Sequence, residues 1–298
     1  MTWVILAVFA HFLWAVVNLG DKYVMEKKFS SPVFYTICGL VVGSLVSLSF
    51  LPFMRLSWIS WIAAAGAVLA GVGFILGSLF YVKAIQIEEA SRVNILWVFI
   101  PIFDFIFGWL LLGEKLVGTR LLAFGILLSG SLIACVHWRD NHWKFSRAFL
   151  LMLASCLFFS SYDVVMRYLT QRAPFAPLYM VAVVSMLCWL VPIMLTKAFR
   201  RKYQAEFRKI DWWLFGVVIF IAIVSRLGLL LNTRAISLGP VSLVSALEGF
   251  QTIFVFVIAA LLTVFVPRII KEEFDRRNSV LKLMALVLML GGIATLYL

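Results

Sequence analysis

The sequence predicts an all-α membrane protein in which ten transmembrane helices form two inverted repeats of five helices each. Three observations lead to this fold class: an apolar composition, apolar segments along the whole chain, and an internal repeat. Of the 298 residues, 64% are hydrophobic and 13% are charged, whereas soluble globular proteins carry about 25% charged residues. We therefore do not expect a soluble globular protein.

The first five expected spans form the first repeat, residues 1–140. An apolar helix of about 20 residues crosses the hydrocarbon core of a bilayer, and a helix satisfies its backbone polar groups within the segment. Pro32 stands where the second span would begin, a position that tolerates a residue without a backbone donor. The expected spans cover residues 3–20, 32–53, 58–82, 92–112 and 117–136.

The second five expected spans form the second repeat, residues 141–298. Pro174 and Pro240 stand at expected helix starts, in keeping with the same preference. The longest connections, near residues 198–211 and 267–278, are charged. The expected spans cover residues 147–168, 175–197, 212–235, 241–266 and 279–298.

Two blocks of the first half recur in the second half in the same order. At an offset of 145, Trp14, Asn18, Lys22 and Tyr23 fall on Phe159, Asp163, Arg167 and Tyr168. At an offset of 151, the third and fourth spans match the eighth and ninth, as in Leu76-Gly77 and Leu227-Gly228. A unit of five helices leaves the membrane on the side opposite its entry, so a second copy must be inverted.

The net charge of +12 comes from Lys and Arg residues in the connecting loops. The loops on one side hold 19 of them and the loops on the other side hold 6. Cytoplasmic loops are the more basic ones, so we expect both termini outside the cell. Basic loops that contact anionic lipid explain the charge without a nucleic-acid partner.

Polar residues recur at helical spacing on four spans, two from each half. The first span carries one such stripe from His11 to Asp21, and the ninth carries another from Ser242 to Gln251. Because ionisable groups in hydrocarbon are costly, such stripes face a cavity or a partner. The predicted substrate or ion pathway consists of His11, Trp14, Asn18, Asn94, Asp104, Asp163, Arg226, Glu248 and Gln251.

Each of these residues also has a structural interpretation. Arg226, near the middle of an apolar span, would form an ion pair with Glu248 or Asp104, whose net stabilisation would be small after desolvation. Asp163 would pair with Arg167, four residues along the same helix. His11 would be a buried, hydrogen-bonded histidine.

Enzyme and metal signatures are not found in the sequence. It contains no glycine-rich phosphate loop, no paired His-Glu zinc motif and no plausible Ser-His-Asp set. The single cysteines Cys38, Cys135, Cys156 and Cys188 suit small core residues. We therefore expect no catalytic residue, no cofactor and no metal.

The chain resembles the drug/metabolite transporter superfamily in its EamA-like form. The resemblance rests on the WAVVNLGDK block at Trp14, the block that ends in Gly113-Glu114-Lys115, and the echo of that block in the second half. It implies two inverted five-helix repeats around a central cavity. In two respects the chain departs from the family. Glu272 or Glu273 stands in for Glu114 in the second half, and the family's termini are usually cytoplasmic.

The expected function is that of a secondary transporter that moves a small metabolite across the cell membrane by alternating access. Membrane lipids and a small-molecule substrate are the expected partners, with a coupled proton or an exchanged solute, and a homodimer is also considered. The expected location is the cytoplasmic or inner membrane of a prokaryote. The alternatives are a flippase for a lipid-linked substrate and a membrane scaffold or sensor without transport.

Overall fold

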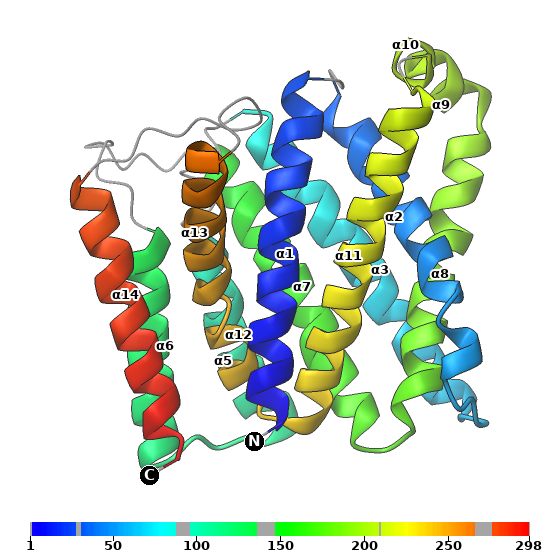
Figure 1. Ribbon diagram of the computed structural model, residues 1–298. Coiled ribbons are helices and arrows are strands. Elements are labelled where there is room, and N and C mark those ends of the chain that lie inside the picture. Colours follow the sequence, from blue (N-terminus) through cyan, green and yellow to red (C-terminus); the bar gives the residue numbers. More distant parts are fainter. Residues whose placement is uncertain are drawn as a thin grey trace.

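The protein is a bundle of helices that run roughly side by side (Figure 1). The computed structural model describes residues 2–27, 31–87, 96–135, 147–208, 210–265 and 276–297, and within them it has no β-strand. The all-α prediction is therefore confirmed for this part of the chain. The elements are α1 (Thr2–Lys27), α2 (Pro32–Leu48), η1 (Leu51–Phe53), α3 (Trp61–Ile85), η2 (Leu96–Val98), α5 (Phe99–Leu112), α6 (Thr119–Cys135), α7 (Arg147–Thr170), α8 (Phe175–Leu195), α9 (Lys197–Lys202), α10 (Gln204–Phe207), α11 (Trp212–Leu238), α12 (Val241–Ala246), α13 (Gly249–Phe265) and α14 (Arg276–Thr295).

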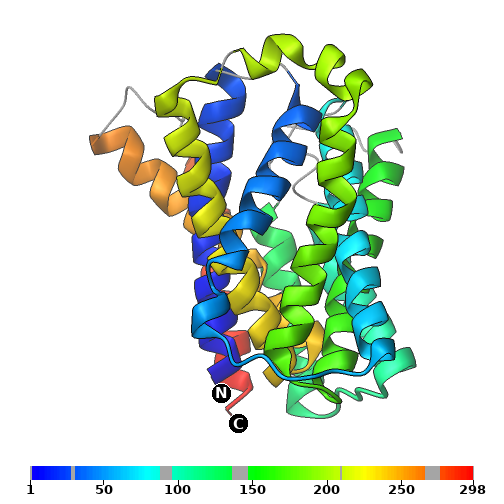
Figure 2. The same cartoon turned by 90° about the vertical axis from the view of Figure 1, so that its right-hand side faces the viewer.

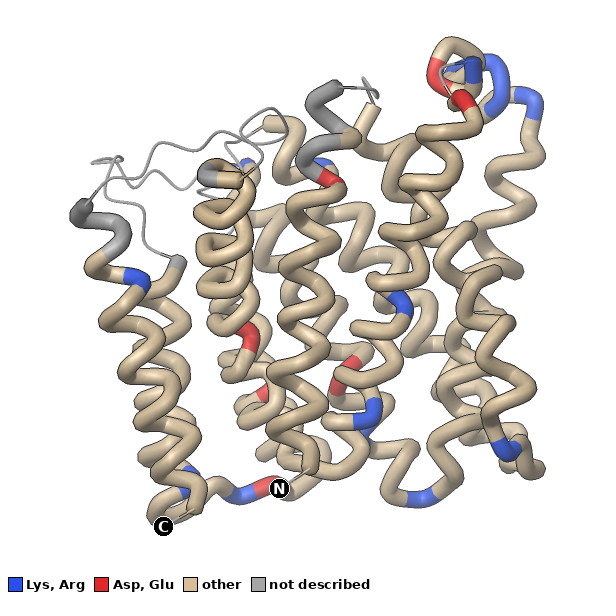
Figure 3. Tube along the Cα trace, viewed as in Figure 1, with Lys and Arg blue, Asp and Glu red and all other residues tan. Residues whose placement is uncertain are grey.

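Several helices are long and apolar enough to cross a membrane. In the described residues there are six such segments, namely Thr2–Asp21, Trp61–Ile85, Arg147–Thr170, Phe175–Leu195, Trp212–Leu238 and Val241–Thr263. The shorter apolar helices are Pro32–Leu48, Leu96–Leu112, Thr119–Ala134 and Val280–Thr295. Both chain ends lie at one end of the bundle (Figures 1 and 2), and most Lys and Arg residues lie near its two ends (Figure 3).

The first and second expected spans end at other residues than the helices observed. The second was expected to reach residue 53, but α2 ends at Leu48 and a 3₁₀ turn follows. Pro52 lies at the start of that turn, where its missing amide prevents the α-helix from continuing. The first was expected to end at residue 20, but α1 continues to Lys27. The boundary at residues 140 and 141 and Glu272 and Glu273 lie outside the described residues.

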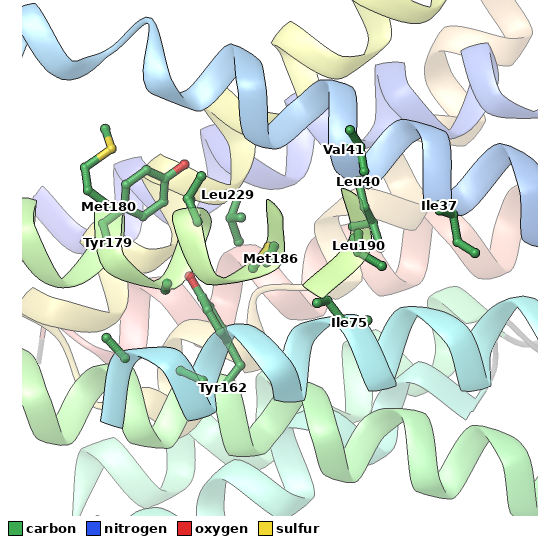
Figure 4. Packing of buried hydrophobic residues seen from close by; sticks show 14 of the residues in the cluster. Ile37, Leu40, Val41, Ile75, Tyr162, Tyr179, Met180, Met186, Leu190 and Leu229 are labelled. Atoms are coloured by element: carbon green, nitrogen blue, oxygen red, sulfur yellow. The ribbon is translucent and has the colours of Figure 1, made fainter. Parts of the chain in front are cut away.

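The helices pack in a pattern that brings the two halves of the chain together. α1 packs against α11 and α13, and α3 packs against α7 and α8. The largest group of buried apolar residues comes from α1, α2, α3, α7, α8 and α11. In it Tyr162 from α7 points toward α8, near Met186 and Leu229 (Figure 4). Helices in lipid associate mainly through such close packing and through interhelical hydrogen bonds.

Gly71 is the point where α3 approaches α8 most directly. A Cβ atom placed there would collide with the Ser185 hydroxyl and lie 2.5 Å from the backbone carbonyl oxygen of Ala182. A backbone atom cannot move aside as a flexible side chain can. The absence of a side chain at Gly71 therefore sets the distance between these two helices.

We expect Gly71→Ala to destabilise the protein by about 1–3 kcal/mol, the usual range for overpacking, and so to lower its thermal unfolding temperature in detergent. Gly39→Ala in α2 is the matched control, because a Cβ atom there would meet nothing within 4 Å. Alanine also favours a helix over glycine. Equal unfolding temperatures for the two variants would contradict this account of the α3–α8 contact.

Candidate functional site

Asp104 is a fully buried carboxyl group that joins three helices. It lies on α5, and its two oxygens accept hydrogen bonds from the hydroxyls of Ser160 on α7 and Ser245 on α12, each at 2.5 Å. The hydroxyl of Ser245 also lies 2.7 Å from the carbonyl oxygen of Val241. One hydroxyl proton cannot satisfy both acceptors, but a protonated Asp104 could donate to Ser245 while Ser245 donates to Val241. The geometry therefore suits a carboxyl group that holds a proton.

Glu248 lies where the ninth expected span is interrupted. That span, predicted over residues 241–266, is present as the apolar segment Val241–Thr263, but it is not one continuous helix, because Leu247 and Glu248 separate α12 from α13. Around this break the amides bond three residues back, Glu248 to Ser245 at 2.9 Å and Phe250 to Leu247 at 3.0 Å. A stretch of 3₁₀-type bonds inside a long helix often marks a functional hinge.

Ser131 on α6 explains how the break is tolerated. In a continuous α-helix the amide of Phe250 would bond to the carbonyl oxygen of Ala246, but here it bonds to Leu247. The hydroxyl of Ser131 donates to the carbonyl oxygen of Ala246 at 3.0 Å in its place. Gly249 allows this approach, since a Cβ atom there would lie 2.7 Å from the Cα of Ser131.

Asp163 completes a group of three interior carboxyl groups. Asp163 on α7 is 9% exposed, and its carboxylate lies close enough to Asp104 and Glu248 for the three to repel one another. Among the residues that the structure describes, no basic side chain forms an ion pair with any of them. Like charges in a low-dielectric interior are unfavourable, so this group calls for protons or for a bound cation.

His11 and Trp14 come from α1, and Gln251 comes from α13, three residues after Glu248. Nδ1 of His11 lies 3.4 Å from the side-chain oxygen of Gln251, so with this amide orientation Nδ1 carries the proton. Nε2 of the buried ring then accepts, yet it has no hydrogen-bond partner in the described part of the chain. Trp14 stacks edge-on against His11 and donates to the carbonyl oxygen of Ser225 on α11 at 3.3 Å.

Arg226 is buried in a different environment from the carboxyl groups. Its guanidinium donates to the carbonyl oxygen of Leu40 on α2 at 3.2 Å and to the sulfur of Met186 on α8 at 3.7 Å. Gly43 makes room for it, because a Cβ atom there would collide with Nε of Arg226. No carboxylate of the described residues pairs with it. The alternative ion pair with Glu248 or Asp104 is therefore not observed.

The remaining predicted residues are placed as follows. Asn18 lies on an exposed position of α1 and makes no hydrogen bond with another described residue. Asn94 lies outside the described residues. Asp163 does not form the intrahelical pair with Arg167 that was considered, because Arg167 bonds to Glu114 instead, at 2.7 Å.

Sequence reasoning missed the contacts that depend on tertiary structure. Glu114 was named only as part of the Gly113-Glu114-Lys115 motif, and no role was predicted for Ser131. A signal for Ser131 exists, since it is a polar residue within an apolar span. In the described part of the chain, no group of three or more His, Cys, Asp or Glu side chains could hold a metal ion.

Comparison with known proteins gives a family match for the first part of the chain and supports the fold. Residues 1–136 match the family model described as the EamA-like transporter family, which confirms the resemblance. A solved crystal structure shares the fold with a TM-score of 0.67 and 16% sequence identity, covering 98% of this chain and 95% of that chain. At that identity the similarity bears on the fold alone. No curated protein matches the chain. The family match and the apolar helices together support a multi-pass membrane protein.

We expect Ser131→Ala to destabilise the break between α12 and α13, because the buried carbonyl oxygen of Ala246 would lose its donor. An unsatisfied buried acceptor costs about 1–3 kcal/mol, which thermal unfolding in detergent would detect. Ser129→Ala is the matched control, since Ser129 is exposed and bonds only to Gly125 of its own helix. If Ser129→Ala lowered the unfolding temperature as much, Ser131 would have no special role.

Proposed function

We propose that the protein is a secondary transporter that moves a small metabolite across the cell membrane by alternating access. The observation that carries this proposal is a group of carboxyl groups beside an interrupted helix, in which Asp104 and Asp163 are buried and Glu248 is partly buried. Ionisable groups inside a membrane protein mark substrate or ion pathways by default. Transporters of this kind also build their sites from interrupted helices near the midplane.

Two inverted repeats, residues 1–140 and 141–298, form the moving parts. The packing supports this division, because exchanging helices for their expected counterparts reproduces several of the main observed helix pairs. The pair α3–α7 becomes α11–α1, the pair α3–α8 becomes α11–α2, and the pair α5–α7 becomes α13–α1, and all of these pairs are present. α1 and α7 also run in opposite directions through the bundle (Figure 1).

A 3₁₀ turn stands at the corresponding position of the first half. The offset of 151 carries Leu96 and Trp97 onto Leu247 and Glu248. Leu96 and Trp97 lie in the 3₁₀ turn η2 that precedes α5. Interruptions at corresponding positions of two halves are the best sequence-level indication of a transporter's binding site. We place the site between these two turns.

In this proposal the carboxyl groups and Arg226 have different tasks. Asp104 and Glu248 take up protons or bind a cationic group of the substrate, and Asp163 adds to the negative potential. Arg226 attracts an anionic group, or holds a carboxylate in another state of the cycle. His11, Trp14 and Gln251 line the same pathway. A buried guanidinium without a carboxylate partner is costly to maintain, which supports a functional role for Arg226.

The proposed setting follows from charge and family. We propose the cytoplasmic or inner membrane of a prokaryote, with both termini outside the cell on the basis of the more basic loops at the opposite end. Membrane lipids are the surroundings, a coupled proton or exchanged solute accompanies the substrate, and the protein functions alone or as a homodimer.

We expect Glu248→Gln and Arg226→Gln each to lower transport by about tenfold or more, the effect of about 1.4 kcal/mol, because each removes an interior charge. Uptake into proteoliposomes would be measured for labelled amino acids, organic acids, nucleosides and amines, with and without a pH gradient. At least one of these compounds should be taken up saturably by the unmodified protein.

Asp211→Asn and Arg234→Gln are the matched controls for these charge changes. Asp211 caps the start of α11, a task that asparagine performs as well, and Arg234 is exposed. Both should transport normally. Full transport by folded Glu248→Gln and Arg226→Gln would remove these residues from the mechanism. Absence of saturable uptake by the unmodified protein across the panel would contradict the proposed function.

A further inference from the structure

We propose that α12 is the gate at the end of the bundle where both termini lie, held shut by Glu114 and Arg167 and hinged at Leu247 and Glu248. This inference rests on the proposed alternating access, since only a transporter of that kind must open each end in turn. It assigns to Glu114 and Arg167 a role in controlling access to the interior carboxyl groups.

Glu114 holds the start of α12 through two contacts. One carboxylate oxygen accepts from the backbone amide of Val241, the first residue of α12, at 3.0 Å. The other forms an ion pair with Nε of Arg167 at 2.7 Å. Glu114 follows α5 in the first half of the chain, whereas Arg167 and Val241 belong to the second half. The contact therefore crosses between the two proposed moving parts.

Arg167 fixes the end of the preceding helix at the same point. One of its terminal nitrogens donates to the carbonyl oxygens of Ile236 and Ser237, at 3.1 and 2.9 Å, in the last turn of α11. The turn from α11 to α12 is thus held on both sides. Trp3 covers it, because a Cβ atom at Gly239 would lie 2.6 Å from the Trp3 ring. The start of α12 is therefore packed and hydrogen-bonded in place at this end of the bundle.

The rest of α12 leads directly to the candidate site. All six of its residues are buried. Ser245 reaches Asp104, and the carbonyl oxygen of Ala246 is held by Ser131 beside the break. If Val241 moved away from Glu114 while the break flexed, Ser242 and Ser245 would become open to the end of the bundle, and the contact with Asp104 would be released.

The contacts that hold α12 suit a gate because water can replace them. Glu114 and Arg167 are 13% and 15% exposed, so both ions are near solvent at the end of the bundle. Hydrogen bonds through water are nearly as favourable as direct ones, so release costs far less than separating apolar helices would. A difference of a few kcal/mol between two conformations leaves the minor one measurably populated.

The test measures how fast a membrane-impermeant maleimide labels a cysteine at position 242 from the side of the termini. The full-length protein carries Ser242→Cys with its four native cysteines replaced by alanine, in vesicles of known orientation. We expect Glu114→Gln and Arg167→Gln each to raise the labelling rate by about tenfold or more, which corresponds to ~1.4 kcal/mol. The labelling rate of the double variant should be little higher than that of either single variant, because both residues act through one contact.

Two controls separate a gate from a structural brace. Lys115→Gln removes an exposed charge next to Glu114 and should leave the labelling rate unchanged. A cysteine at Ser155, buried on α7, should stay unlabelled in Glu114→Gln, whereas equal gains at positions 155 and 242 would show general loosening and overturn the gate.

The outcomes also distinguish the gate from the proposed function. Unchanged labelling at position 242 in Glu114→Gln and Arg167→Gln overturns the gate even where uptake into vesicles is normal. Faster labelling in a protein that takes up none of the compounds supports a gate that opens α12, while the transport proposal fails on its own test.

Discussion

Hydrocarbon offers no hydrogen-bond partners, so polar groups inside the bundle rely largely on the protein for theirs, and this constraint shapes the interior. Asp104 is held by two serine hydroxyls from two other helices. The carbonyl oxygen that the helix break frees at Ala246 accepts from Ser131, and the first amide of α12 is bonded by Glu114. The interrupted helix is stable because side chains from other helices supply the partners that its own backbone has lost.

Apolar packing and polar contacts have different roles in the bundle. Contacts such as Gly71 against Ala182 set fixed distances between helices, and they cannot change without loss of packing. Polar contacts at the ends of α12 can be exchanged for water at modest cost. The bundle thus combines rigid helix pairs with one short segment whose attachments are replaceable, which is what rocking of two repeats around a site requires.

The length and hydropathy of the apolar segments, together with the offset between the two repeats, were enough to predict the helical class and most helix positions. They failed where tertiary contacts decide the outcome. Nothing in the run from Val241 to Val266 reveals that α12 ends at Ala246, because the break depends on Ser131 from another helix. Spacing placed Asp163 and Arg167 on one helix face, but Glu114, 53 residues away in sequence, is the partner of Arg167. The burial of Asp104, Arg226 and His11 agrees with the prediction that polar stripes face the interior. The hydrogen-bond partner of each residue could not be predicted from the sequence.

In the proposed transporter the carboxyl groups face a wet interior and not the lipid. The most direct measurement is the accessibility of a spin label at position 163, in vesicles, to a water-soluble nickel complex and to oxygen, which concentrates in lipid. A label at position 287, which is exposed on α14, provides the lipid reference. The account predicts that the label at 163 collides mainly with the nickel complex and the label at 287 mainly with oxygen. Preference for oxygen at both positions would contradict it.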